Sequence, residues 1–128
     1  MITYAERVCF SAPHLHLFRR VEAYVMRVSD TWGNDLRCHE LARAVHLVVY
    51  ESAHKLVIVD GHCGPVEHSW LCCSDGVILD PYAPGRLPAV QLVDPLVGAA
   101  YRPGTLRRDI RQPIVDRLVA EMRGDVSR

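Results

Sequence analysis

The feature that most constrains the fold is a change of hydrophobic period near residue 55. Before that point, apolar residues recur at helical spacing over residues 13–28 and again over residues 36–52. After it, the chain is rich in β-branched residues and is divided by glycine and proline turns. Strands are predicted over residues 55–60, 66–73, 77–80 and 89–93, a loop over 98–105, and a last helix over 113–122. Helices followed by a small antiparallel sheet and a further helix indicate an α+β fold.

Each predicted helix carries an apolar face, and the first two have residues suited to begin them. Ser11 is predicted to cap the first helix ahead of Pro13. Asp35 or Asn34 is predicted to cap the second, and with Asp35 as the cap Cys38 would be its third residue. The predicted core-facing residues are Leu15, Phe18, Val21, Tyr24 and Val25, then Leu41, Ala42, Val45, Val48 and Val49, and finally Ile114, Leu118 and Val119.

Length and composition indicate a single domain that spans residues 1–128. Apolar residues make up 49% of the chain, which is enough for one hydrophobic core. The formal net charge is zero, so the composition gives no electrostatic argument for binding nucleic acid or a membrane surface. The five cysteines cannot all pair, and the sequence has neither a secretory signal pattern nor a membrane-spanning stretch. We therefore expect a cytoplasmic protein with free thiols.

Three residues follow one another in an order that suits covalent catalysis: Cys38 at a helix start, His68 in one strand and Asp80 in the next. A helix start and a nearby imidazole both lower the pKa of a thiol, which would make Cys38 a nucleophile. His68 would act as its base, and Asp80 would fix the orientation of the ring. With five cysteines and seven histidines, such an order also arises by chance. A buried cysteine and a half-buried strand histidine are the plain structural alternative.

The turn between the two strands makes a specific geometric demand. Alternation places His68 and Trp70 on one face of their strand. A two-residue turn would place Asp80 opposite Leu71, on the wrong face. A three-residue loop over residues 74–76, ending in a left-handed glycine, places Asp80 opposite Trp70 and diagonal to His68. The catalytic hypothesis therefore predicts the three-residue loop or an equivalent bulge.

Acyl transfer also needs donors for an oxyanion and a surface for the substrate. The backbone N–H of Cys38 is one predicted donor, and the side chain of Asn34 in the preceding loop is the other. Trp32, Trp70 and Tyr82 are predicted to border the substrate, although each would serve equally well as a packing residue.

The segment from Cys38 to Pro81 resembles the core of the transglutaminase-like branch of the papain-like cysteine protease superfamily. That family places a nucleophilic cysteine at the start of a buried helix. A strand carrying His-small-Trp follows, and then a strand ending in Asp, as in His68-Ser69-Trp70 and Leu79-Asp80-Pro81. The resemblance implies a catalytic triad of Cys38, His68 and Asp80 that acts on an amide of a protein or peptide. Such enzymes are thiol proteases and other hydrolases, deamidases or acyl transferases, and this chemistry requires no cofactor.

Other functions stay open beside this one. Arylamine acetyltransferases share such a triad and often a run like residues 37–40, but this chain is too short for their coenzyme-binding domain. The interval from Cys38 to His68 is also short and leaves room for one connecting strand, which is too little for an extended substrate cleft. Activity would therefore require a partner protein or a homodimer. The alternative function is a non-catalytic binding or assembly protein that keeps the fold.

The remaining histidines and cysteines give weaker signals. His39 and His46 lie on nearly one side of the second helix, where a surface or packing role is expected rather than a second base. His14 and His16 are expected to face solvent. Zinc-type ligands occur near the strands but fit no paired CxxC spacing, so we predict no metal site; they are His62, Cys63, His68, Cys72 and Cys73.

Overall fold

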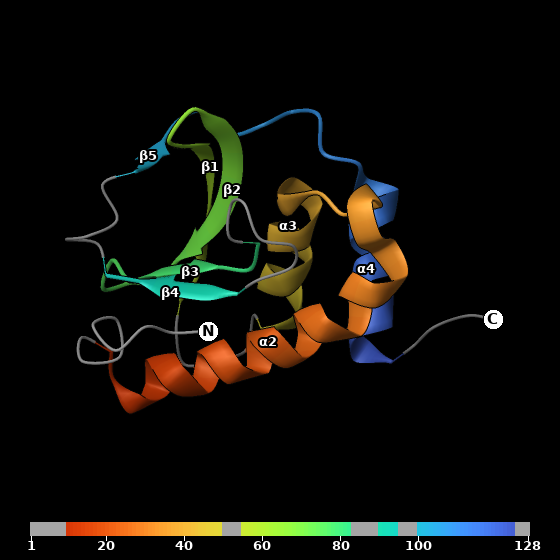
Figure 1. The fold of residues 1–128 in the computed structure, drawn as a ribbon, viewed down its shortest axis with the longest axis horizontal. Helices are drawn as coiled ribbons and strands as arrows, with labels where there is room; N and C mark the ends of the chain where they lie inside the picture. The colour runs from red at the N-terminus through yellow and green to blue at the C-terminus, as the bar shows by residue number, and fades with distance from the viewer. Residues whose placement is uncertain (1–9, 50–54, 83–89, 95–99, 125–128) are drawn as a thin grey trace.

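A computed structural model of the chain describes residues 10–49, 55–82, 90–94 and 100–124. Within them, three α-helices and a five-stranded antiparallel sheet confirm the α+β class (Figure 1). None of the helices in these ranges combines the length and the apolar character that crossing a membrane requires. The elements are α2 (Ala12–Trp32), the 3-10 turn η1 (Gly33–Asp35), α3 (Cys38–Val48), β1 (Val57–Cys63), β2 (Val66–Cys72), β3 (Ile78–Asp80), β4 (Gln91–Val93), β5 (Tyr101–Pro103) and α4 (Gln112–Arg123).

Helix α2 begins as predicted and runs on to Trp32. Ser11 is its N-cap: the Ser11 hydroxyl accepts from the backbone N–H of His14, and the His14 ring accepts from the backbone N–H of Ser11 at 3.2 Å. Because its ring closes this capping box, His14 is buried, and the expectation that it faces solvent is wrong. Leu15 and Tyr24 are only half-buried. The buried apolar face consists of Leu17, Phe18, Val21, Val25 and Val28.

Helix α3 is shorter than predicted and begins at Cys38 itself. Residues 33–35 form η1, and Leu36 and Arg37 are both extended, with ψ angles of 118° and 145°. Arg37 is therefore the N-cap, and the prediction that Asn34 or Asp35 caps this helix is wrong. The extended stretch carries the Leu36 side chain into the core, where it is 2% exposed. The helix ends at Val48, and residues 50–52 of the predicted helix lie outside the described residues.

The sheet has the strand order β4-β3-β2-β1-β5, and every neighbouring pair is antiparallel. Strand β5 lies where a loop was predicted, so that prediction is wrong. A three-residue edge strand that ends in proline carries no strand pattern in the sequence. Its pairing with β1 depends on Gly61, because a Cβ atom there would collide with the carbonyl oxygen of Arg102.

Helix α3 lies between the sheet and α4, and α2 runs across the ends of both layers (Figure 1). The two faces of β2 serve different clusters: Leu71 belongs to the main core with the helices, whereas Trp70 packs with Ile78 and Val93 in a smaller cluster. In α4 the buried face is Val115, Leu118 and Met122. The predicted Ile114 and Val119 are half-buried and flank that face.

A buried carboxylate fixes the start of α3. Glu40 is 0% exposed and accepts from the Arg37 Nε at 2.7 Å, the Arg111 Nη2 at 3.0 Å and the Arg111 backbone N–H at 3.2 Å. Burial disfavours the charged form, but the hydrogen bonds with Arg37 and Arg111 outweigh this and lower the pKa of Glu40 to about 2. Arg111 is the N-cap of α4. The ionised Glu40 therefore ties the first turn of α3, which carries Cys38, to the start of α4.

Candidate active site

Cys38 is the first residue of α3 and is half-buried. It is the first and not the third helical residue, but the expected electrostatic setting is the same. The N–H groups of a first helical turn have no partners within the helix and carry partial positive charge. Cys38 therefore lies where a thiolate is favoured. Its own backbone N–H is one of these first-turn groups and is the predicted oxyanion donor.

His68 and Asp80 meet as the hairpin geometry requires. The pairs Leu71–Leu79 and Cys72–Ile78 leave residues 74–76 as a three-residue loop, in which Gly76 has a φ of 92°. The predicted loop is thus confirmed, and the register continued by one residue places Asp80 opposite Trp70. The Nε2 atom of His68 lies 2.7 Å from Oδ2 of Asp80, and both side chains are buried.

Cys38 and His68 influence each other electrostatically, and their pKa values move in opposite directions. Burial opposes ionisation of the thiol, but hydrogen bonds with His39 and His68 outweigh it and lower the pKa of Cys38 to about 6. Burial also opposes the charged imidazole, but hydrogen bonds with Asp80 and Cys38 raise the pKa of His68 to about 9. Between these values the favoured state is a thiolate beside an imidazolium. Nε2 of His68 is held by Asp80, which leaves Nδ1 as the ring nitrogen that can exchange a proton.

Asp80 is held by groups from three elements. Besides His68, it accepts from the Tyr101 hydroxyl at 2.7 Å and from the backbone N–H of Tyr82 at 3.0 Å. Trp70 stacks on the His68 ring with centroids 5.9 Å apart, and Tyr101 meets Trp70 edge to face at 5.2 Å. The aromatic side chains therefore cover the imidazole. The three hydrogen bonds fix the orientation of the Asp80 carboxylate. The contact of Tyr101 with Asp80 could not be predicted from the sequence, because Tyr101 lies in the unpredicted strand β5.

A second histidine lies against the sulfur, which the sequence analysis did not expect. His39 is buried, with Nδ1 at 3.5 Å and Nε2 at 3.9 Å from Sγ of Cys38. Its Nδ1 also lies 2.6 Å from the hydroxyl of Ser69 on β2. The surface role considered for His39 is therefore wrong. The serine of His68-Ser69-Trp70 was the available signal, because alternation points it to the opposite face from His68, toward α3.

The structure brings only some of the other predicted site residues together with the triad. Tyr82 is the second residue after β3, and its pKa is raised by burial and by the negative charge of Cys38. Trp70 is 2% exposed and therefore contacts His68 rather than an external substrate. Trp32 donates to Glu121 at 2.9 Å and lies under Arg117, at the contact with α4. Asn34 is exposed in η1.

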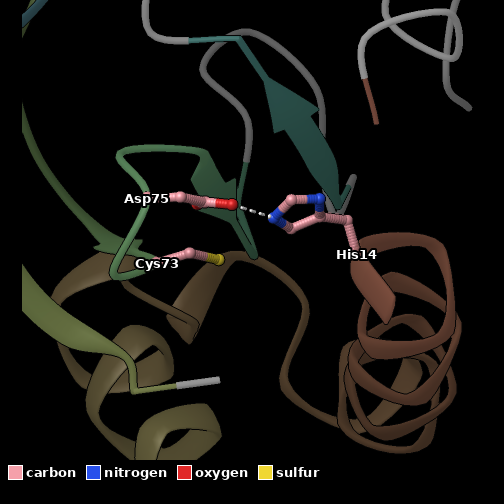
Figure 2. Close-up of side chains that lie close together, drawn as sticks. All are labelled: His14, Cys73 and Asp75. Atoms are coloured by element: carbon pink, nitrogen blue, oxygen red, sulfur yellow. Dashed lines mark ion pairs between the residues drawn. The ribbon is translucent and has the colours of Figure 1, made fainter. Parts of the chain in front are cut away.

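Another group of possible metal ligands lies on the opposite side of the fold from α4. His14, Cys73 and Asp75 place one ligand atom each within 4.8 Å of one another (Figure 2). The Ser11 N–H donates to Nδ1 of His14, so the ring proton is on Nε2, which lies 2.8 Å from Asp75. Burial, with Asp75 nearby, raises the pKa of Cys73 to about 12 and keeps a protonated thiol. The His14–Asp75 contact joins the start of α2 to the β2–β3 loop.

A hollow of about 370 Å³ lies between α2 and α4, away from the triad. It is basic, because three arginines contribute to its wall, but Arg27 already donates to the carbonyl of Met122. None of the three triad residues lines it. Its lining residues are Arg20, Ala23, Tyr24, Arg27, Met122 and Arg123.

In comparisons with protein-family models, curated proteins and solved structures, no match to the chain was found.

Proposed function

We propose that this protein is a cysteine-dependent acyl-transfer enzyme that hydrolyses or deamidates an amide of a protein or peptide. The observation that carries the proposal is the buried His68–Asp80 hydrogen bond of 2.7 Å together with Cys38 at the start of α3, where the pKa of Cys38 is lowered to about 6 and that of His68 is raised to about 9. A structural cysteine in an apolar core has its pKa raised instead, as Cys73 does. We also propose that the fold is a small relative of the transglutaminase-like branch of the papain-like fold.

Each residue has a defined part in the proposed reaction. The thiolate of Cys38 attacks the amide carbon, and the oxyanion that forms is held by the N–H groups at the start of α3. The C–N bond breaks as the proton on His68 passes to the leaving nitrogen. Water then attacks the thioester and gives one proton to His68, the C–S bond breaks, and a carboxylic acid and the thiolate are restored. An amine in place of water would give transfer instead of hydrolysis.

Replacing Cys38 by alanine tests this proposal with a blocked glutaminyl-glycine dipeptide as substrate and ammonia release as readout. Turnover by the full chain is expected to fall by roughly 10³-fold or more, because no thioester forms. Intact mass should show an acyl adduct on Cys38 in the wild type, and hydroxylamine should capture the acyl group as a hydroxamate.

Cys72→Ala is the matched control, because Cys72 is a half-buried thiol whose Sγ contacts the carbonyl of Cys73. It should retain wild-type turnover. If the wild type forms no adduct with this or longer peptide amides, the enzyme proposal is wrong and the binding or assembly function takes its place.

A further inference from the structure

Two imidazoles, those of His68 and His39, act on the sulfur of Cys38, and the proposed reaction uses only His68. Adjacent helical residues point in directions about 100° apart, so the side chains of Cys38 and His39 do not face each other by default. Their contact at 3.5 Å therefore requires something that draws the His39 ring toward the sulfur. The buried hydroxyl of Ser69 does this, because it holds Nδ1 of His39 at 2.6 Å.

Ser69 is the middle of a buried chain of polar groups. Its hydroxyl donates to Oδ1 of Asp60, and Arg43 donates to both oxygens of that carboxylate at 3.1 and 2.6 Å. The Arg107 backbone N–H donates to Asp60 as well, at 2.9 Å. Burial disfavours the charged form, but the hydrogen bonds with Arg43 and Ser69 lower the pKa of Asp60, so it is a carboxylate. Asp60 and Ser69 are 1% and 0% exposed, which keeps water from competing for these contacts.

This series of hydrogen bonds determines which nitrogen of His39 carries the proton. A carboxylate only accepts hydrogen bonds, so the single hydroxyl proton of Ser69 goes to Asp60. The Ser69 oxygen must then accept from His39, which places the proton on Nδ1. That one N–H is shared: the Ser69 oxygen at 2.6 Å is its main acceptor and Sγ at 3.5 Å is a second, weaker one, so a donor stays beside the sulfur. Arg43 also donates to the His39 carbonyl at 3.1 Å and holds the backbone of the same residue.

We propose that His39 is a positioning residue that holds the Cys38 thiolate through a contact of its own, separate from the proton-carrying His68. The two imidazoles then divide the work. His68 is free to pass its proton to the leaving nitrogen and to take another from water. His39 keeps an N–H donor near the sulfur throughout, because Ser69 and Asp60 fix its tautomer. This inference rests on the proposed function for its catalytic meaning, but its physical content is tested without a substrate.

The test is the pH dependence of iodoacetamide alkylation of Cys38 in the full chain. His39→Phe removes the N–H, and the midpoint should rise by about one pH unit, with a roughly fivefold to tenfold slower reaction at pH 6. His39→Asn is the rescue variant, because its amide nitrogen can take the place of Nδ1, and its rate should stay within about twofold of the wild type. The other titratable groups near the sulfur are His68 and Tyr82, and Glu67 acts on His39; all are retained.

The controls separate a lost donor from a damaged fold. His46→Phe changes a histidine of the same helix whose ring contacts the Leu56 carbonyl instead, and should leave the midpoint unchanged. In His39→Phe, ¹⁵N NMR of His68 should still show its titration, because the contact with Asp80 does not involve His39. An unchanged midpoint in His39→Phe, or an equal rise in His39→Asn, overturns the inference. If the alkylation midpoints of Cys38 change as predicted but no amide turnover is found, the proposed function is refuted and the role of His39 in holding the thiolate stands.

Discussion

Replacing Asp80 by asparagine is expected to lower the pKa of His68 from about 9 to 6.5 or below, as followed by ¹⁵N NMR of its ring. In the wild type, hydrogen bonds with Asp80 and Cys38 outweigh the burial that lowers this pKa. Asparagine keeps the shape but removes the charge, so burial then dominates. Because the folded pKa of His68 lies above its ordinary value of 6.5, protonated His68 stabilises the fold fully below pH 6.5. This stabilisation is lost as the pH rises through about 9. At pH 8 the proton-carrying fraction of His68 should fall roughly 30-fold, and amide turnover with it.

Tyr101→Phe provides the matched control for this experiment. The Tyr101 hydroxyl donates to Oδ2 of Asp80, the same oxygen that contacts His68, but it carries no charge. Its loss should leave the His68 pKa within about one unit of the wild type. A His68 pKa near 9 in Asp80→Asn would mean that the carboxylate does not hold the imidazolium, and the assigned role of Asp80 would fail.

Replacing Glu40 by glutamine is expected to give the largest loss of stability among the polar substitutions considered. The folded pKa of about 2 lies below the unfolded value of about 4.3. Ionised Glu40 therefore contributes about 3 kcal/mol of unfolding free energy, present above pH 4.3 and lost as the pH falls toward 2. Glutamine removes the charge that holds Arg37 and Arg111. Urea unfolding at pH 7 should show a decrease of about 2–4 kcal/mol.

Glu67→Gln is the control for Glu40, since its side chain is 65% exposed and contacts Arg107 at the surface. Its loss should leave the unfolding free energy close to that of the wild type, because water and salt screen an exposed ion pair. The two variants should also differ in acid, because the wild type and Glu67→Gln lose stability between pH 4 and 2 more steeply than Glu40→Gln does. Equal stability of Glu40→Gln and the wild type at pH 7 would show that the buried carboxylate does not secure the start of α3.

The parts of the site that the sequence predicted are those governed by local rules. Alternation in β2 and a loop ending in glycine determine that Asp80 reaches His68, and both can be counted along the chain. The Ser11 cap was equally local. The switch from helical to strand periodicity near residue 55 was strong enough to give the α+β class.

The parts that were missed depend on contacts between distant segments. Whether α3 starts at Leu36 or Cys38 is decided by core burial of Leu36 and by Glu40 binding Arg111. Tyr101 reaches Asp80 only because Gly61 lets β5 approach β1. His39 turns to the sulfur because Ser69 is held by Asp60 and Arg43. None of these partners is close enough in sequence to leave a local pattern.

We propose that Cys38 is an ionised thiol at neutral pH because the imidazolium of His68 stabilises it. The most direct measurement is the rate of iodoacetamide alkylation at each cysteine of the full chain as a function of pH, resolved by mass spectrometry. We expect Cys38 to react with a midpoint near pH 6, while Cys63, Cys72 and Cys73, whose pKa values are raised by burial, react with midpoints above that of an ordinary thiol. In His68→Ala the Cys38 midpoint should rise toward about 8.5. A wild-type midpoint at or above 8.5, or one that His68→Ala leaves unchanged, would contradict the account.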